Sequence, residues 1–197
     1  MNYLAHAYLS FGEPTVLLGN MISDDIKGKK QFDYPPGVQR GIQLHRAIDA
    51  YTDAHAVTKA LKKFFAAEVR LYAGAFVDVV YDHFLATDPT GPSAAEWMAF
   101  TQDTYGLLAD QAELFSPYFG KVFPYMREQN WLYNYRFDWG VEKSFGGLVR
   151  RAHYLNPNHG CFALFQANKA SMAPLAQLFL ADVKKFSQEW LAEHLPQ

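Results

Sequence analysis

The stretch His45-Arg46-Ala47-Ile48-Asp49-Ala50-Tyr51-Thr52-Asp53 is the part of the chain that predicts both its fold class and its site. His45, Asp49 and Asp53 recur at four-residue steps, so on a helix all three side chains project from one face. Apolar residues from Ile42 to Tyr51 keep helical spacing as well. The stretch therefore predicts a helix that presents an imidazole and two carboxylates together.

A second stretch, Asp78-Val79-Val80-Tyr81-Asp82-His83, repeats this arrangement within an otherwise apolar segment. Its two carboxylates lie one turn apart, and like charges on one helical face repel each other, more strongly when they are buried. A cation between them is one compensation, because imidazole and carboxylate ligands on facing helices suit a divalent ion such as manganese, iron or zinc. Ion pairs with Arg46 or Arg70 are the structural alternative.

Composition and charge restrict the class of protein. With 197 residues, 50% of them hydrophobic, the chain can bury one sizeable core, so we expect residues 1–197 to form a single domain. A net charge of −2 and a pI near 6.4 predict no nucleic-acid partner. The chain has one cysteine, Cys161, and shows neither a signal-peptide pattern at Met1 to His6 nor an apolar run that could span a bilayer. We therefore expect a cytoplasmic protein without membrane insertion.

Helical periodicity continues along most of the chain, and alternating strand patterns are absent. Pro35-Pro36 marks one helix start and Ser93 with Glu96 marks another, at the spacing of a capping box. We expect helices or short helical segments at about residues 17–22, 36–51, 57–68, 71–85, 94–115, 118–126, 130–136, 141–149 and 162–194. The predicted fold is an all-α, single-domain helical bundle.

Other polar residues gain value only if the fold brings them to the two acidic stretches. Asn2 and His6 are four residues apart, and Asn20 precedes Asp24 by one turn. Taken alone, His6 is more often a packed core residue and Asn20 a cap. Residues without an expected part in the site are His55, His159 and His194, expected at the surface; His153, expected at a solvated helix end; and Cys161, expected in a turn without a base partner.

Four segments together resemble the acyl carrier protein phosphodiesterases: Met1 to His6, Gly19-Asn20 with Asp24, Gly41 to Asp53, and Asp78 to Leu85. A weaker similarity runs through Asn130 to Arg136 and Gly147 to Arg151. The resemblance implies removal of the 4′-phosphopantetheine arm from holo acyl carrier protein by hydrolysis of its serine phosphodiester. It also implies a helical fold similar to the HD-domain metal phosphohydrolases, with a divalent ion, Mn(II) above all.

The chain departs from the HD-domain pattern at one point. It contains no adjacent His-Asp pair, and its nearest equivalent is the inverted Asp82-His83. Neighbouring helical side chains point about 100° apart, so the two residues need not reach one metal ion.

The resemblance implies a site with members from all four segments. The expected metal ligands are His6, Asp24, His45, Asp82 and His83. The expected catalytic residues are Asp24, Asp49, Asp78 and Arg46, since a carboxylate can orient the attacking water and a guanidinium can grip a phosphate oxygen or pair with a site carboxylate. The residues expected to support these groups are Asn2, Asn20 and Asp53.

Acyl carrier protein is small and acidic, so the resemblance also implies a basic docking surface. The lysines expected to form it are Lys27, Lys29, Lys30, Lys59, Lys62 and Lys63. Two other functions stay open from the sequence: a metal phosphohydrolase of nucleotides or other small phosphate esters, and a non-catalytic helical binding module whose carboxylates pair with arginines. Stacked carboxylates argue against a haem or bilin pocket.

Overall fold

The computed structural model describes residues 1–152, 154–156 and 160–194, and within these ranges the chain is helical, with no strand. Its α-helices are α1 (Tyr3–Tyr8), α2 (Pro14–Ile22), α3 (Pro36–Ala54), α4 (Ala56–Val69), α5 (Ala73–Ala86), α6 (Ala94–Ala109), α7 (Pro117–Glu128), α8 (Trp131–Asn134), α9 (Asp138–Arg151) and α10 (Cys161–Glu193). A 3₁₀ helix, η2 (Gly28–Asp33), lies between α2 and α3. The predicted all-α fold is confirmed, and the assignment of residues 1–197 to one domain stays a prediction.

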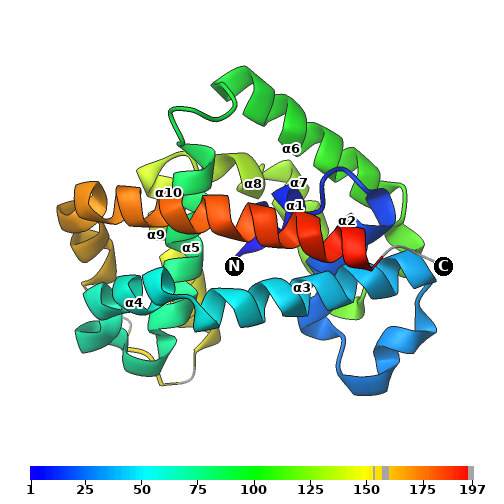
Figure 1. Cartoon of the computed structure of the whole chain (residues 1–197), viewed down its shortest axis with the longest axis horizontal. Helices are drawn as coiled ribbons and strands as arrows, with labels where there is room; N and C mark the ends of the chain where they lie inside the picture. Colours follow the sequence, from blue (N-terminus) through cyan, green and yellow to red (C-terminus); the bar gives the residue numbers. More distant parts are fainter. Residues whose placement is uncertain (153, 157–159, 195–197) are drawn as a thin grey trace.

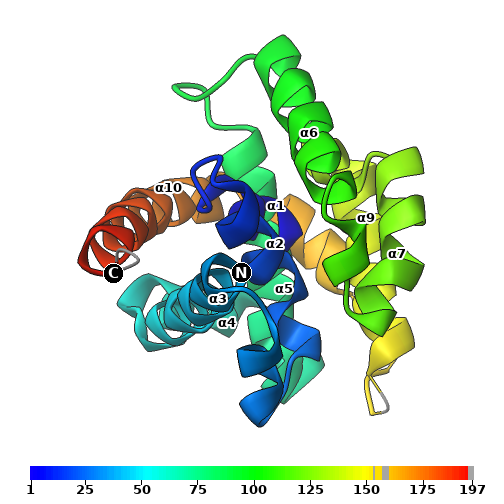
Figure 2. The ribbon, with the colours of Figure 1, turned by 90° about the vertical axis from the view of Figure 1, so that its right-hand side faces the viewer.

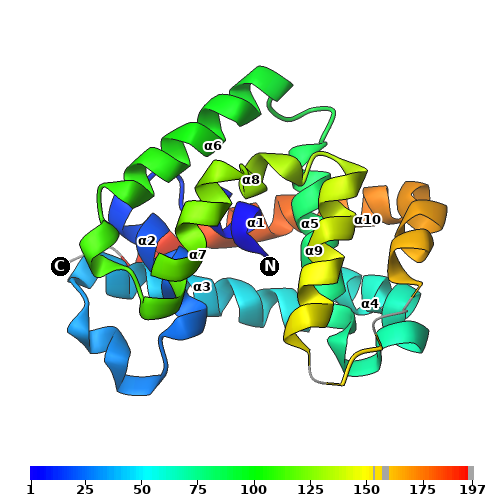
Figure 3. The same ribbon diagram turned by 180° about the vertical axis from the view of Figure 1, so that it is seen from behind.

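Helix α10 crosses the molecule alongside α3 in the view of Figure 1, and the helices together form three layers. In the side view of Figure 2, α3, α4 and α10 lie on one flank, α6, α7 and α9 on the other, and α1, α2 and α5 between them. Figure 3 shows the N-terminus near the middle of the molecule, with α7, α8 and α9 arranged around α1. Where the structure describes the chain, none of its helices has the length and apolar character needed to cross a bilayer.

Helix α5 passes through the core. Eleven of its 14 residues are buried, as expected for a helix that is apolar on nearly all sides. Its neighbours include α1, α4, α9 and α10. Asp82 and His83 are therefore carried into the interior, where their polar atoms need partners.

Helices α2 and α3 are in direct backbone contact. A Cβ atom added at Gly19 would lie 2.1 Å from the Val38 carbonyl oxygen, and one added at Gly41 would lie 2.2 Å from the Val16 carbonyl oxygen. Because no side chain fits at either glycine, the two helices approach as closely as their backbones allow. This approach places the residue after Gly19 beside the middle of α3.

Helix α1 is absent from the predicted helices, because six residues are too few to show a period. Its start is bound by a carboxylate of α5: the Leu4 and Ala5 amides donate to the two oxygens of Asp82 at 2.9 and 3.2 Å. These bonds satisfy amides that a helix leaves open at its N-terminus, where negative charge is also favoured by the helix dipole. The short helix is thereby fixed to α5, with His6 in its last turn.

Two predicted positions change near α5 and α10. The helix predicted to start at Leu71 begins at Ala73, because Arg70 has a positive φ of 47° and separates α4 from α5. Cys161 is the first residue of α10 and is buried, so the expectation that it lies in a turn is wrong. The neighbouring Gly160 suggested a turn, but the Cys161 side chain packs in the apolar core at the start of the helix.

The helix predicted to reach Phe115 ends at Ala109. Just beyond this end, the Gln111 side chain donates hydrogen bonds to the carbonyls of Leu107 and Pro14, at 3.0 and 2.9 Å. The bond to Leu107 satisfies a carbonyl of the last turn, and the bond to Pro14 ties α6 to α2. A short 3₁₀ turn follows and continues the apolar pattern that suggested a longer helix.

Candidate metal centre

Two imidazoles stack face to face where α1 meets α3. The ring centroids of His6 and His45 lie 3.9 Å apart, and the ring planes are inclined by 13°. Both residues are buried, with 3% and 6% of their surface exposed. Each ring has two nitrogen atoms that need partners, so their surroundings decide what the pair can do.

Asn20 of α2 binds both imidazoles. His6 Nδ1 donates to its side-chain oxygen at 2.7 Å, and His45 Nδ1 donates to its backbone carbonyl, also at 2.7 Å. The amide nitrogen of Asn20 donates to the His6 carbonyl and the Ser10 hydroxyl, which fixes the orientation of the amide. Because both Nδ1 atoms donate, each neutral ring presents an unprotonated Nε2 atom.

The two Nε2 atoms face carboxylates. Asp49 places one oxygen 3.4 Å from His6 Nε2 and the other 3.2 Å from His45 Nε2, and an Asp24 oxygen lies 3.3 Å from His45 Nε2. Both Nε2 atoms are buried without a hydrogen-bond partner. His6, His45 and Asp49 each offer one ligand atom within 4.8 Å of the others. Imidazole nitrogen and carboxylate oxygen at this spacing form a possible divalent-metal site.

The charges of this group already favour a cation. Burial opposes the charged form of His45, but Asp24 and Asp49 outweigh it and raise the pKa of His45 to about 9. Burial and the neighbouring His45 lower the pKa of His6 to about 4. Burial raises the pKa of Asp49, yet the two imidazoles outweigh this and hold it well below its usual range. At neutral pH the positive charge is the proton on His45 Nε2, which the carboxylates stabilise and which a metal ion bound at that nitrogen would replace.

The ammonium group of Met1 is buried beside the same carboxylates. It lies 3.1 Å from an Asp49 oxygen and 3.2 Å from an Asp78 oxygen. Burial opposes the charge, but Asp78 and Asp49 raise the pKa of the ammonium to about 11. Burial raises the pKa of Asp78, and the ammonium offsets this only in part. Asp78 therefore joins the group through the ammonium and not through an imidazole.

The structure does not bring Asp82 and His83 to this group. Asp82 accepts the α1 amides described above, and burial raises the pKa of Asp82 to about 7 although those bonds favour the carboxylate. His83 Nδ1 donates to the Tyr135 carbonyl at 2.7 Å, and its Nε2 lies 4.0 Å from Asp138. Burial lowers the pKa of His83 to about 4. The Asp82 oxygens both have partners, whereas His83 Nε2 is buried without a hydrogen-bond partner. Neither residue lines the hollow beside His6 and His45, so we leave both out of the ligand set proposed below.

Arg46 and Asp53 contact other parts of the chain. Arg46 lines a hollow beside Asp24, but its guanidinium donates to the Gln31 side chain at 2.8 Å and to the Ile26 carbonyl at 2.9 Å. It therefore anchors the segment of η2 instead of pairing with a site carboxylate. Asp53 is exposed at the end of α3 and pairs with Lys62 at 2.7 Å.

The six predicted docking lysines form two separate groups. Lys27, Lys29 and Lys30 are exposed in and next to η2, and Lys27 lines a hollow together with His45 and Asp49. The other three lysines, at 59, 62 and 63, lie on α4, at the opposite end of α3 (Figure 1). Only the first group adjoins the possible metal site.

Two of the four histidines predicted to lie away from the site can be placed. His194 is exposed, as predicted. His55, also expected at the surface, is half-buried at the start of α4. Its ring accepts a hydrogen bond from the Val57 amide, and its Nε2 lies 3.3 Å from Asp182 of α10. His153 and His159 lie outside the described residues.

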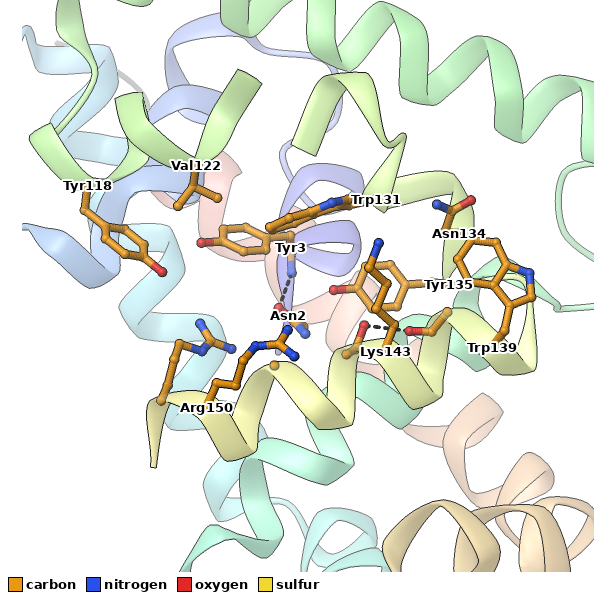
Figure 4. A pocket seen from close by; sticks show the side chains of 14 residues that line it. Asn2, Tyr3, Tyr118, Val122, Trp131, Asn134, Tyr135, Trp139, Lys143 and Arg150 are labelled. Carbon is orange, nitrogen blue, oxygen red and sulfur yellow. Dashed lines mark hydrogen bonds between the residues drawn. The ribbon is translucent and has the colours of Figure 1, made fainter. Parts of the chain in front are cut away.

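Two hollows meet beside the imidazoles. One, of about 190 Å³, is lined by both imidazoles, Asp24 and Asp78. The other, of about 230 Å³, lies between α1, α7, α8 and α9 (Figure 4). Asn2, Tyr3 and Arg151 line both, so the second hollow continues from the first.

Several of these features had little or no signal in the sequence. Nothing in the residue pattern places the Met1 ammonium or the Ser10 hydroxyl in the site. Arg151 had a signal, because it ends the weaker of the similar segments, but its distance from the acidic stretches in sequence concealed its position.

An all-α fold with two buried imidazoles and two carboxylates beside one hollow places the chain among helical proteins with a possible divalent-metal site. A family model described as "Acyl carrier protein phosphodiesterase" matches residues 1–183. The chain therefore belongs to the acyl carrier protein phosphodiesterase family.

Individual relatives agree with the family match. A protein of Serratia proteamaculans (strain 568) named acyl carrier protein phosphodiesterase is 32% identical over 170 residues, which cover 85% of this chain and 88% of the relative. A Salmonella paratyphi A protein of the same name is 32% identical over 77% of this chain and 79% of its own length. One from Yersinia pestis is 40% identical over 44% of this chain and 45% of its own. No solved structure matches significantly, so the expected likeness to the HD-domain phosphohydrolases stays a prediction.

Proposed function

We propose that this protein is a metal-dependent phosphodiesterase that hydrolyses the serine phosphodiester of holo acyl carrier protein, giving apo carrier protein and 4′-phosphopantetheine. The observation that carries the proposal is the pair of buried Nε2 atoms, on His6 and His45, that face carboxylates and have no hydrogen-bond partner. Family membership supports the substrate, since the relatives' name specifies a carrier protein and a phosphodiester bond.

The residues of the site fit a divalent ion. A buried polar atom without a partner costs about 1–3 kcal/mol, and a metal ion bound to His6 Nε2 would remove that cost. At His45 the ion would replace the proton that Asp24 and Asp49 stabilise. We propose His6, His45, Asp49 and Asp24 as ligands and Mn(II) as the ion, because imidazole and carboxylate ligands together suit it. When bound, such an ion lowers the pKa of a water molecule and neutralises charge on phosphoryl oxygens.

Other residues of the chain complete the reaction in this proposal. Asp78 lines the hollow and its pKa is raised by burial, so it is suited to accept a proton from the attacking water. Arg151 lines the same hollow and attracts the anionic diester. Asn20 holds both imidazoles with their Nε2 atoms toward Asp49. Arg46 is engaged with η2 and receives no role in the reaction.

The basic side of η2 is the proposed docking surface for the acidic carrier protein. Lys27, Lys29 and Lys30 are exposed there, next to a hollow that reaches His45 and Asp49. Complementary charge would bring the carrier's serine to the site and speed encounter. We also propose a cytoplasmic location, which the single, buried cysteine supports.

The alternative of a binding module is not supported by the ion pairs. It expects the acidic stretches to pair with arginines, whereas the ion pairs of Asp49 and Asp78, within the described part of the chain, are with imidazoles and an ammonium. A phosphohydrolase of small esters would use the same metal group and needs an experiment to separate it.

The test incubates the purified protein with holo carrier protein and Mn(II) and follows the mass of the carrier. We expect loss of the phosphopantetheine mass, abolished by a chelator and by Asp49→Asn. Asp53→Asn is the matched control, one turn along the same helix but outside the site, and should behave as the wild-type protein does. Free nucleotides serve as competing substrates. No mass change with manganese, iron or zinc, or faster hydrolysis of nucleotides than of the carrier, would overturn the proposal.

A further inference from the structure

The hollow between α7, α8 and α9 is lined by aromatic and basic side chains. In Figure 4, α9 supplies Trp139, Lys143 and Arg150 along one side, and Tyr118 and Trp131 lie on the other. Trp139 and Tyr118 are 51% and 45% exposed, high for large aromatic side chains. Aromatic surface that a monomer leaves in a concave site is available to a ligand.

The walls of this hollow are fixed to each other. The Gln129 side-chain oxygen accepts hydrogen bonds from Trp131 Nε1 at 3.2 Å and from Lys143 Nζ at 2.8 Å. One residue thereby joins the α8 side to the α9 side. These two bonds hold the walls together in the absence of a ligand, which lowers the cost of ordering them on binding.

The hollow leads to the possible metal site. Tyr3 and Arg151 line both hollows, and Arg151 lies close enough to Tyr3 to oppose the rise that burial causes in the pKa of its hydroxyl. Arg151 is at the C-terminal end of α9, whereas Trp139 is near its start. A ligand with its anionic end at Arg151 would run along α9 toward Trp139.

The charge of the lining residues and the length of the hollow along α9 indicate which kind of ligand fits. Lys143, Arg150 and Arg151 line the hollow, and no carboxylate is among its described lining residues. Trp139 and Arg150 are eleven residues apart, which on a helix is roughly 16 Å. The space thus suits a slender, extended molecule with an anionic group at one end and mixed apolar and amide character along its length.

We infer that this hollow holds the pantetheine arm of the substrate, with the phosphodiester at Arg151 beside the metal group and the thiol end toward Trp139. The inference rests on the proposed function, because that function supplies a substrate with this chemistry. The gem-dimethyl group and the amides of the arm would pack on Trp131 and Trp139, and burial of the arm would position its phosphodiester for attack. The carrier protein itself would remain outside the hollow, on the η2 side.

The experiment measures binding without turnover. Metal-free protein is titrated with pantetheine and with 4′-phosphopantetheine while tryptophan fluorescence is recorded. We expect saturable changes with both probes, tighter binding of the phosphorylated probe, and a loss of about five- to tenfold in affinity in Trp139→Ala. Tyr125→Ala is the control, since Tyr125 is an exposed aromatic residue of α7 that does not line the hollow. Apo carrier protein should not displace pantetheine.

A second measurement separates failure of the inference from failure of the proposed function. In the hydrolysis of holo carrier protein, Trp139→Ala should raise KM by about five- to tenfold and Tyr125→Ala should leave it unchanged. If the wild-type protein hydrolyses the carrier and Trp139→Ala has the same KM, the assignment of the hollow to the pantetheine arm is wrong, whereas the proposed function stands. If pantetheine binding depends on Trp139 but the wild-type protein does not hydrolyse the carrier, the assignment of the hollow is supported and the proposed function is wrong. Displacement of pantetheine by apo carrier protein would assign the hollow to a protein segment and overturn the inference.

Discussion

His45 to Asp53 on α3 and Asp78 to His83 on α5 carry the same residue types at helical spacing, yet only the first stretch supplies an imidazole to the hollow. On α3, the Nε2 atom of His45 is buried, lacks a hydrogen-bond partner and faces carboxylates. On α5, the carboxylate of Asp82 binds two backbone amides of α1. Asp82 has thus used its oxygens to fix a helix, and the unpartnered Nε2 atom of His83 lies outside the lining of the hollow.

The difference teaches that spacing alone does not separate a ligand from a structural group. Both His45 and His83 have a buried Nε2 atom without a hydrogen-bond partner, and what separates them is that only His45 lines the hollow with carboxylates beside it. Asp78 illustrates the point, because it belongs to the same α5 stretch as Asp82 and yet its carboxylate lines the hollow and pairs with the Met1 ammonium. Four substitutions or conditions would break or sharpen this contrast.

The largest effect should come from His45→Ala. Removal of this imidazole should lower metal affinity and carrier hydrolysis at least about a thousandfold, since loss of a partner that merely supports a ligand costs about 10–100-fold. At a pH above about 9, where His45 is neutral, the free energy of unfolding of the metal-free protein should fall by only about 1 kcal/mol, through the lost bond to the Asn20 carbonyl. At neutral pH the variant also loses the stability that comes from the ion pairs of His45 with Asp24 and Asp49. Metal titration and urea unfolding measure the two effects. Unchanged metal affinity would remove α3 from the site.

Asp82→Ala should show the opposite signature. Two buried amides of α1 lose their acceptor, so the free energy of unfolding should fall by about 3 kcal/mol. Asp53→Ala makes the same change at an exposed position and should cost less than about 1 kcal/mol. Urea unfolding measures both. Equal stability of the two variants would contradict the structural role of Asp82.

Lowering the pH should reduce the free energy of unfolding through protonation of His83 on α5. The pKa of this buried imidazole is about 4 in the folded protein, against about 6.5 when unfolded, so the unfolded state binds more protons between these values. Stability is therefore lost as the pH falls through this window, by about 2 kcal/mol between pH 7 and pH 5 for this residue.

The variant that isolates this term is His83→Asn, which keeps a donor for the Tyr135 carbonyl but cannot titrate. Its loss of stability from pH 7 to pH 5, followed by urea unfolding, should be smaller than that of the wild-type protein by that amount. An identical pH dependence in both proteins would show that His83 is not held neutral.

The smallest effect concerns the lysines. Replacement of Lys27, Lys29 and Lys30 by Glu should raise the KM for holo carrier protein about fivefold at low salt and less at high salt, because exposed charges are screened. The same replacement at the three α4 lysines should change KM little, since that group lies at the other end of α3. Steady-state kinetics at two ionic strengths measure both. Equal effects of the two triple variants would disprove local docking.

The helices could be predicted because their apolar residues recur at helical spacing over two or more turns, as in α3 and α5. Short α1 could not, because its stability comes from a carboxylate 77 and 78 residues away in the chain. The same limit applies to His6, whose value depends on contact with His45 across two helices.

Site residues followed the same rule. His45 and Asp49 were predicted from their spacing and Asp24 from the family resemblance, and the structure gathers them around one point. Asp82 and His83 have equally suggestive spacing, and no pattern in the sequence shows that backbone groups bind both Asp82 oxygens and the Nδ1 atom of His83. The aromatic hollow lies between four helices, α1, α7, α8 and α9, whose arrangement depends on tertiary packing.

The contact between Gly19 and Gly41 sets the distance between Asn20 and His45 by backbone against backbone. Side chains elsewhere in the core can change shape or volume during evolution without altering that distance, because none of them stands between the two helices at this point. The geometry of the imidazole pair is in this sense insulated from mutational drift. A library that randomises the core while keeping these two glycines should yield proteins of very different melting temperature with one common metal affinity.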